Sequence, residues 1–320
     1  MALKSDHSRA IRCSGRQPLV SVIIPHLDDV DRLRMCAQAI EAQSLPRQHV
    51  EIVVGDNGSR CGIDAVQRAA PSARLVSVAE RGAGPARNHA VLAARGDVLA
   101  FTDSDCIPSR EWLTEGLAAL GHADMVGGAM MVSVADPDRP TGAEAFEMAM
   151  AFDNRRYVEE QGFSVTANLL VRRDVFEAVG GFRTGVPEDL DWCRRAATAG
   201  YTLSYAPRAV VSHPARQSFA ALARKWRRLT DEAWADQVGT PYARWLWAAR
   251  AAAVAASPLL HGPRLMTTSR IPGIAPRARA AGVLLRLRIL RAQWMLEQAI
   301  AGASPVKRDT TGALCGIGRP

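Results

Sequence analysis

The sequence predicts an α/β protein with a mostly parallel, doubly wound sheet and a helical C-terminal extension. Between residues 19 and 102, four β-branched or apolar runs alternate with segments of helical periodicity. From Ser218 onward the chain is mostly helical, with an interruption by prolines around 257–276. A sheet of this kind binds ligands outside the carboxyl ends of its strands, so the residues that follow the strands are the first candidates for a functional site.

The length and composition fit one large domain with an appendage. The chain has 320 residues, of which 48% are hydrophobic. We expect four segments: a flexible tail over 1–17, the α/β domain over 18–215, a basic helical region over 216–302 and a disordered tail over 303–320.

Periodicity and turn residues predict the individual elements. Strands are expected at Leu19–Ile24, Val50–Gly55, Leu75–Val78, Val98–Thr102, Met125–Val134, Val165–Arg172, Leu203–Ala206 and Ala209–Ser212. Helices are expected over 30–40, at Ile63–Ala70, from Pro85 through Ala94, and at Ser109–Leu120, Gly142–Glu160, Asp174–Val179, Glu188–Ala199 and Ala280–Ala301.

The net charge of +8 is unevenly distributed along the chain. Residues 1–213 carry 23 Lys and Arg against 27 Asp and Glu, whereas residues 214–320 carry 17 against 5. The basic final third is therefore expected to meet phosphates or an anionic membrane surface. With 6% aromatic residues and no nucleic-acid-binding motif, the sequence predicts no nucleic-acid partner.

The cysteines and the apolar segments indicate the cellular compartment in which the protein is expected. Six cysteines are scattered without a regular spacing, as expected for reduced thiols of a cytosolic protein with neither disulfide framework nor zinc site. The first seventeen residues lack the apolar core of a signal peptide. The apolar segment Trp245–Leu260 is interrupted by Arg250 and Pro258 and is too short to span a bilayer. We therefore expect a cytoplasmic protein that is not integral to a membrane.

Two carboxylates follow the fourth predicted strand. In Asp103-Ser104-Asp105 the alternation of an extended chain places both acids on one face, where they repel unless a cation lies between them. Taken alone, this segment is more typical of a polar turn before the helix expected at Ser109–Leu120. Asp28 and Asp29 follow the first strand and Asp56 the second, and the set of strand-end acids favours a functional cluster.

Other polar segments have competing interpretations. Gly82–Arg87 resembles a dinucleotide fingerprint but has Arg87 in place of the third glycine; it could bind phosphate at a helix N-terminus or be a plain turn. Glu188, Asp189 and Asp191 open a helix, where the helix dipole favours acids. His213 is by default a loop histidine. The basic segment 224–228 could be a solvated helix face, a phosphate clamp or a nucleic-acid patch.

Taken in order, these segments resemble the family 2 glycosyltransferases of the GT-A fold, with a Rossmann-like sheet, over roughly Leu19–Arg228. The matching motifs are Val20–Pro25, Val53–Ser59, Gly84–Asn88, Ala94–Asp97, Thr166–Leu170, Gly180–Phe182 and Glu188–Asp191. The resemblance implies that residues 18–120 bind a nucleotide-diphospho-sugar and residues 121–215 bind the acceptor.

The resemblance also implies roles for individual residues. Asp189 would be the catalytic base, with Asp191 as the alternative, and Asp105, Asp103 and His213 would hold Mg²⁺ or Mn²⁺. Donor contacts would come from Pro25, Asp28, Asp56, Arg87 and Asp103, and acceptor-side contacts from Asn168 and Glu188. The expected reaction is metal-assisted, in-line transfer of one sugar to a hydroxyl group, with inversion.

The sequence departs from the family pattern in two places. His26-Leu27-Asp28 replaces the aromatic-Asn pair after the opening proline, and the Gln-x-x-Arg-Trp signature of processive synthases is absent, which favours single-sugar transfer. Two alternatives are a sugar-1-phosphate nucleotidyltransferase, which should carry a Gly-rich signature after the first strand, and a catalytically degenerate GT-A binding protein.

The last predicted helix has two apolar rows. Val283, Leu287, Leu290 and Trp294 form a stripe that could bind the inner membrane face, where a lipid-linked acceptor would wait. The alternative is a helix packed on the catalytic domain, helped by a second row at Leu285, Ile289 and Leu296.

Overall fold

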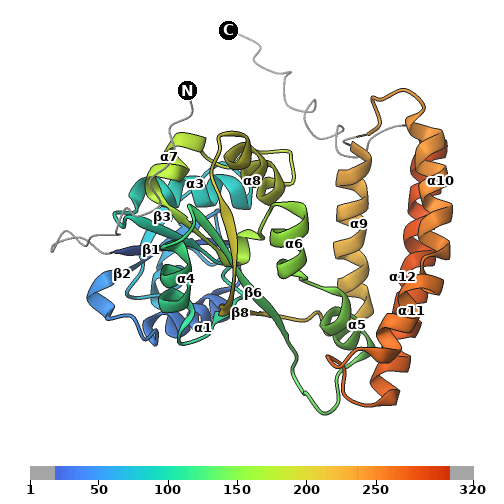
Figure 1. Cartoon of the computed structure of the whole chain (residues 1–320), viewed down its shortest axis with the longest axis horizontal. Coiled ribbons are helices and arrows are strands. Elements are labelled where there is room, and N and C mark those ends of the chain that lie inside the picture. Colours follow the sequence, from blue (N-terminus) through green and yellow to red (C-terminus); the bar gives the residue numbers. More distant parts are fainter. Residues whose placement is uncertain (1–18, 236, 303–320) are drawn as a thin grey trace, which may run out of the picture. The chain divides into compact units, whose positions relative to one another are not determined.

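The computed structural model describes residues 19–235 and 237–302, so the expected tails over 1–17 and 303–320 lie outside the described residues. The chain divides into two compact units (Figure 1). The sheet unit comprises residues 19–132 and 152–214, and the helical unit comprises residues 133–151 and 215–302. Residues 133–151, which the sequence analysis placed within the α/β domain, therefore belong to the helical unit.

The sheet unit is built on eight strands in the order β3-β2-β1-β4-β7-β6-β8-β5. The strands are β1 Val20–His26, β2 Val50–Asp56, β3 Arg74–Ser77, β4 Val98–Phe101, β5 Ile107–Pro108, β6 Met125–Ser133, β7 Leu169–Arg172 and β8 Leu203–Pro214. The first four strands pair in parallel, as predicted. The sheet is mixed, because β7 pairs antiparallel with β4 and β6, and β5 antiparallel with β8.

Helices cover both faces of this sheet (Figure 1). They are α1 Val30–Glu41, α2 Ile63–Ala69, α3 Ala83–Ala93, α4 Trp112–Leu120, α6 Asn154–Gln161, α7 Arg173–Val179 and α8 Glu188–Thr198, with 3-10 turns at Arg47–His49 and Thr166–Asn168. Alternate strand residues face opposite layers: Val22 packs with Leu33 of α1, and Ile23 with Ala90 of α3. The β-branched runs are therefore buried on both faces, which is the pattern expected of central parallel strands.

Three elements differ from the sequence expectation. The helix expected at Gly142–Glu160 is two helices, because Phe152 adopts a positive φ of 51° between α5 and α6. The two short strands expected on either side of Pro207 are one strand, β8. A proline removes only one backbone N–H donor, so it does not by itself end a strand. The proline-rich segment contains α11, which starts on Pro258, a residue favoured in the first helical turn.

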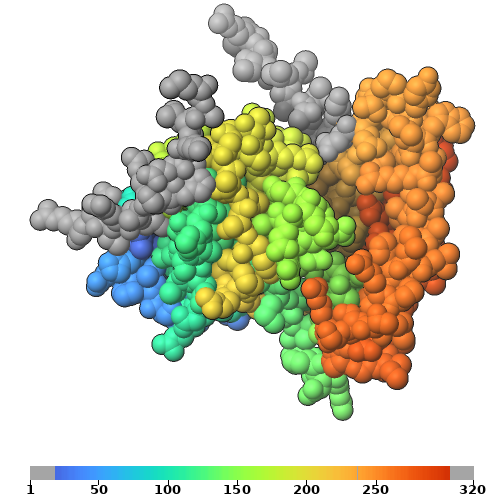
Figure 2. Space-filling view, viewed as in Figure 1, coloured from blue at the N-terminus to red at the C-terminus, as the bar shows by residue number. Residues whose placement is uncertain are grey.

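The helical unit has its own apolar core. Its helices are α5 Gly142–Met150, α9 Phe219–Ala235, α10 Ala243–Ala256, α11 Pro258–Thr267 and α12 Ile274–Ala301. Phe146, Leu222 and Leu284 meet in one cluster, and Trp234, Trp247 and Met295 in a second. Figure 2 shows α10 and α11, in orange, as one continuous surface of this unit. In the described part of the chain, no helix is both long and apolar enough to cross a membrane.

The assignment of the two apolar rows on α12 was wrong. Leu287, from the row predicted to face a membrane, is 1% exposed in the core of the helical unit, and Val283 packs beside that core. The row expected to pack on protein is the outward one, with Leu285 50% and Leu296 44% exposed. The two rows have similar apolarity, so only the positions of α5, α9 and α10 decide which is buried.

Candidate active site

The strand-end acids gather at one edge of the sheet, as predicted. β1 is flanked by β2 on one side and β4 on the other, so the chain reverses its winding direction between β1 and β4. In open α/β sheets such a reversal leaves a crevice at the carboxyl ends of the strands. Asp56 ends β2, Asp28 follows β1, and Asp103 follows β4 at this edge.

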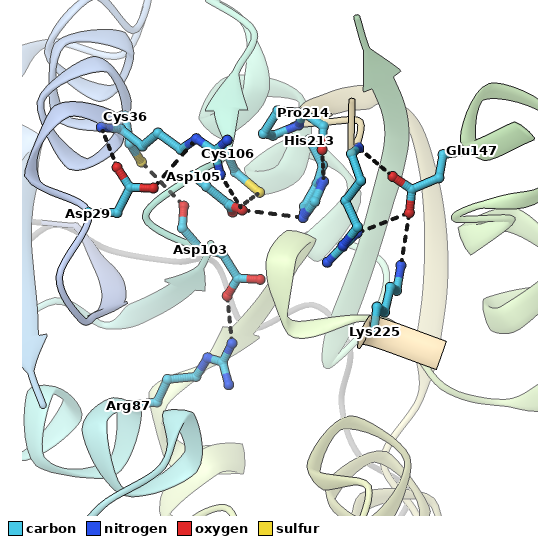
Figure 3. Close-up of polar contacts among 12 residues, drawn as sticks. Asp29, Cys36, Arg87, Asp103, Asp105, Cys106, Glu147, His213, Pro214 and Lys225 are labelled. Atoms are coloured by element: carbon cyan, nitrogen blue, oxygen red, sulfur yellow. Dashed lines mark hydrogen bonds and ion pairs between the residues drawn. The ribbon is translucent and has the colours of Figure 1, made fainter. Parts of the chain in front are cut away.

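Arg87 joins the end of β4 to the start of α8. This arginine is 3% exposed; its Nη2 donates to Asp103 Oδ1 at 2.6 Å, and its Nη1 donates to Glu188 (Figure 3 shows the Asp103 contact). Burial alone would lower the pKa of Arg87, but Asp103, Glu188 and Asp189 raise it above its ordinary value. A Cβ at Gly84 would lie 2.8 Å from Glu188 Oε2, so a side chain there would displace the Glu188 carboxylate that Arg87 binds.

Asp105 points toward a different set of partners. Its Oδ2 lies 3.5 Å from His213 Nε2 and 3.8 Å from Arg32 Nη1 (Figure 3). The Nδ1 atom of His213 lies 2.9 Å from the carbonyl oxygen of Pro214, and its ring packs 4.8 Å from that of Phe152. Because a carbonyl oxygen only accepts, Nδ1 is the nitrogen that donates to Pro214, and Nε2 faces the carboxylate of Asp105.

The residues at this edge fit a hard divalent cation. Ligand atoms of Asp103, Asp105 and Cys106 all lie within 4.8 Å of one another. Carboxylate oxygens are the ligands that Mg²⁺ prefers, and Mn²⁺ accepts imidazole as well. Two atoms that each lie about 2.1 Å from one ion are roughly 3–3.5 Å apart, which matches the separation of Asp105 and His213. Burial raises the pKa of Cys106 well above its ordinary value, so its protonated thiol does not join this set.

Asp189 is an acid in a desolvated position at the start of α8. The backbone N–H and the hydroxyl of Thr166 donate to its two oxygens at 3.3 and 3.1 Å. Burial raises the pKa of Asp189 to about 6, against the opposing effect of Arg87. The carboxylate is therefore ionised at neutral pH but close to its protonation point, which is the property required of a general base.

Asp191 has a different environment. Arg195 Nε lies 2.9 Å from one of its oxygens, and Arg183 Nη1 lies 3.6 Å from the other. Two cations therefore hold this carboxylate in ion pairs, whereas Asp189 accepts hydrogen bonds from a neutral threonine.

The predicted nucleotide end of the crevice contains a buried network. Asp56 accepts from the Ser59 hydroxyl at 2.6 Å and lies 2.9 Å from His26 Nδ1. Burial favours the protonated acid, but these hydrogen bonds hold the pKa of Asp56 below its usual value. Asp28, with a positive φ of 63°, accepts from the backbone and the side chain of Arg60, and the backbone bond holds the pKa of Asp28 below its usual value. Pro25 is half-buried within β1.

Asn168 and Glu188 do not lie free on the predicted acceptor side. Asn168 is fully buried; its amide donates to the carbonyl oxygens of Ala129 and Ala209 and accepts from Trp112 Nε1 at 2.8 Å. In this structure it joins strands and a helix and has no surface for a ligand. Glu188 is engaged by Arg87.

Sequence reasoning missed two residues beside the site. Arg32 on α1 reaches Asp105, and Thr166 orients Asp189, from a segment that was noted only as part of a motif. An arginine 73 residues before its acid carries no sequence signal, since the contact is created by the packing of α1 beside β5, the strand that follows Asp105.

Comparison with known proteins identifies the family. Residues 21–180 match the family model Glycosyl transferase family 2, and the chain belongs to this family of enzymes. It is 32% identical over 219 residues to Glycosyltransferase AglE of Haloferax volcanii, covering 66% of this chain and 71% of that protein. It is 28% identical over 211 residues to the Pre-mycofactocin glycosyltransferase of Mycobacterium tuberculosis, covering 62% of this chain and 43% of that protein. The predicted resemblance is confirmed, and the chain is a glycosyltransferase.

A solved structure shares the fold. The mannosyltransferase PcManGT from Pyrobaculum calidifontis, in complex with GDP-Man and Mn²⁺, superposes with a TM-score of 0.55 at 21% identity, covering 90% of this chain and 88% of that one. The predicted α/β class with a helical C-terminal region is confirmed.

Proposed function

We propose that this glycosyltransferase moves one sugar from a nucleotide-diphospho-sugar to an acceptor hydroxyl, with inversion and with the help of Mg²⁺ or Mn²⁺. The observation that carries the proposal is the pair of contacts made by Arg87. Arg87 contacts Asp103 at the end of β4 and Glu188 in the first turn of α8. These two contacts join the two acidic segments in one charged cluster. A donor-binding group and a general base are thereby held at the same crevice.

Asp189 is the proposed base. Its carboxylate would take the proton of the acceptor hydroxyl as that oxygen attacks the anomeric carbon from the face opposite the leaving nucleotide. The two hydrogen bonds from Thr166 fix the direction of the carboxylate. Asp191, bound by Arg195 and Arg183, is less available for proton transfer, so the structure favours Asp189 of the two candidates.

Asp105, Asp103 and His213 are the proposed metal-holding residues. When bound, Mg²⁺ or Mn²⁺ would offset the negative charge that develops on the leaving diphosphate. Arg32 contacts Asp105 and would have to share that carboxylate with the ion. Asp28, Asp56 and Pro25 lie at the crevice edge proposed for the nucleotide, and the His26–Asp56–Ser59 network would keep that edge rigid.

The acceptor is proposed to be a glycan or a lipid-linked saccharide. The support is the basic helical unit together with the outward row of α12, where Leu285, Ile289 and Leu296 are exposed. An apolar helix face with basic surroundings is typical of reversible binding at an anionic membrane. Co-sedimentation with phosphatidylglycerol vesicles tests this part, and a Leu285→Gln/Ile289→Gln variant should bind them at least severalfold more weakly.

The reaction is tested with a panel of nucleotide sugars, assayed for transfer and slow hydrolysis with Mn²⁺ and with EDTA. Asp105→Asn should lose metal-dependent activity, whereas Asp189→Asn should keep donor binding and lose transfer. Asp191→Asn is the matched control, because it changes an acid in the same helical turn. Full activity of both the Asp105 and the Asp189 variants on the best donor would falsify the assignment.

A further inference from the structure

Two arginines of α12 lie half-buried against one indole of the helical unit. The guanidinium carbon of Arg288 lies 5.5 Å from the ring centroid of Trp226 on α9, and that of Arg291 lies 4.9 Å from it. Residues three apart on a helix are neighbours, so the two cations stand side by side at this ring. Within the described part of the chain, neither forms an ion pair with a carboxylate within 4.0 Å.

Most N–H donors of Arg288 and Arg291 have no acceptor among the described residues. Among the described residues, Arg291 donates through Nε to the hydroxyl of Thr230 at 3.2 Å, and Arg288 has no acceptor; its Nε is buried without a partner. A guanidinium offers five N–H donors in a planar fork. Contact with the indole fixes the positions of the two forks and leaves their N–H groups available to a ligand.

Two acids on the same two helices, α9 and α12, are already engaged elsewhere. Asp231 accepts from Arg227 and from Gln298, and Glu297 lies 3.5 Å from the same Arg227. Positive charge at the site is increased further by Arg250 of α10, which acts on Arg291. Burial lowers the pKa of Arg288, and burial with repulsion from Arg288 and Arg250 lowers the pKa of Arg291 to about 10.

One buried carboxylate of the same unit is paired with two cations. Glu147 of α5 is 3% exposed and meets Arg216 Nη1 at 3.0 Å and Lys225 Nζ at 3.2 Å (Figure 3 shows Glu147 with Lys225). Arg216 and Lys225 therefore supply the counter-charge of this buried carboxylate. The arginine pair lacks an equivalent, so its missing counter-charge is expected to come from outside the chain.

We propose that Arg288 and Arg291, held against Trp226, form a binding site for a phosphate-type oxyanion, a second site outside the crevice of the sheet unit. The oxygens of a phosphate or diphosphate match the spacing of guanidinium N–H groups and accept several charge-assisted hydrogen bonds at once. The same chemistry is offered by a phospholipid headgroup and by a free phosphorylated solute. The site does not depend on the proposed reaction.

The first test is calorimetric titration of the full chain with pyrophosphate, in EDTA so that no metal recruits the probe to the acidic crevice. Wild type should bind pyrophosphate. Arg288→Gln/Arg291→Gln should bind it at least about tenfold more weakly, because the variant loses charge-assisted hydrogen bonds, which are stronger than those between neutral groups. The control is Arg286→Gln, which removes a cation from the same helix that also lies over an aromatic ring, that of Phe219. It should change the affinity less than about twofold.

A second variant distinguishes loss of binding from loss of folding. Arg288→Lys/Arg291→Lys keeps both charges but loses the planar forks, and it should bind pyrophosphate with intermediate affinity and unchanged circular dichroism. Hydrolysis of the best nucleotide sugar should be the same in all these variants and wild type. The proposal is overturned if wild type fails to bind pyrophosphate, or if the double glutamine variant binds as well as wild type.

Vesicles then distinguish the two sources of the anion. If the ligand is a lipid headgroup, the double glutamine variant should lose co-sedimentation with mixed phosphatidylglycerol and phosphatidylcholine vesicles, while Arg286→Gln retains it. If the ligand is a free solute, both variants should sediment like wild type although only one still binds pyrophosphate.

Discussion

Arg87 in the sheet unit is buried and Arg288 in the helical unit is half-buried, but their surroundings carry opposite charge. Arg87 contacts Asp103 and Glu188 and is influenced by Asp189, and these acids raise its pKa. Arg288 lies beside Arg291 and Trp226, and burial lowers its pKa. The first arginine partly neutralises an acidic cluster, and the second belongs to a basic cluster that nothing in the described residues neutralises.

This contrast indicates which ligands each unit attracts. Around Arg87 the carboxylates outnumber the arginine, so the crevice retains negative charge and can accept a divalent cation. Around Arg288 the excess is positive, so the helical unit can accept an anion.

Replacing Arg87 should produce the largest effect. Arg87→Met leaves Asp103 and Glu188 without their cation, and we expect a loss of activity of about 10³-fold and of stability of about 3 kcal/mol. Because Arg87 lowers the pKa of Asp189, the acidic limb of any remaining activity should also move to higher pH. Transfer assays across pH 5–8 and urea unfolding measure these effects.

Arg60→Met is the control for that variant. Arg60 also binds an aspartate, Asp28 at 3.0 Å, but its side chain is 89% exposed, so activity should stay within roughly threefold of wild type. Equal losses in the two variants would contradict the special role of the buried arginine.

Asp189→Asn should lower kcat by about 10²-fold. In wild type the raised pKa of Asp189 means that the carboxylate is lost as the pH falls through about 6, so activity should drop with it. Because the charged acid is disfavoured in the folded state, the amide should raise rather than lower Tm at pH 7.5. If Asp191→Asn instead removes the activity and its pH limb, the assignment of the base is reversed.

Glu147→Gln should destabilise the helical unit by about 3 kcal/mol, because Arg216 and Lys225 lose a buried partner. Although burial opposes it, Lys225 and Arg216 lower the pKa of Glu147 below its unfolded value of about 4.5. Its contribution to stability is therefore present above that value and lost as the pH falls below it. Urea unfolding at pH 7 and pH 4 should show a smaller pH dependence in the variant, whereas Glu159→Gln, at an exposed pair, should match wild type.

Arg288→Met should give a small effect of opposite sign. Removal of a cation that has no acceptor in the described structure should raise stability by about 1 kcal/mol when no anion is present. Addition of pyrophosphate should reduce or reverse this advantage, because only wild type gains from binding it. A Tm of the variant below that of wild type without pyrophosphate would show that the arginine is compensated after all.

Much of the sheet unit could be predicted from the sequence. Leu19–Ile24, Val50–Gly55 and Val98–Thr102 were predicted within two residues of β1, β2 and β4, because buried parallel strands need continuous β-branched or apolar runs. The placement of Asp56 and Asp103 at one sheet edge followed from the same strands. Local patterns were sufficient here because strand ends and their acids are adjacent in the chain.

The partners of those acids required the tertiary structure. Arg32 with Asp105, Thr166 with Asp189, and the buried position of Asn168 join residues far apart in sequence, and no local pattern indicates such contacts. The same holds for α12, whose two apolar rows have similar composition. Which row is buried, and which arginines lose access to a carboxylate, depends on the helices packed against it. The strand pattern and the acids beside it are enough to predict the sheet, its acidic edge and the enzyme family. The packing of distant segments decides which charges are paired among the described residues, because those contacts join positions far apart in the chain.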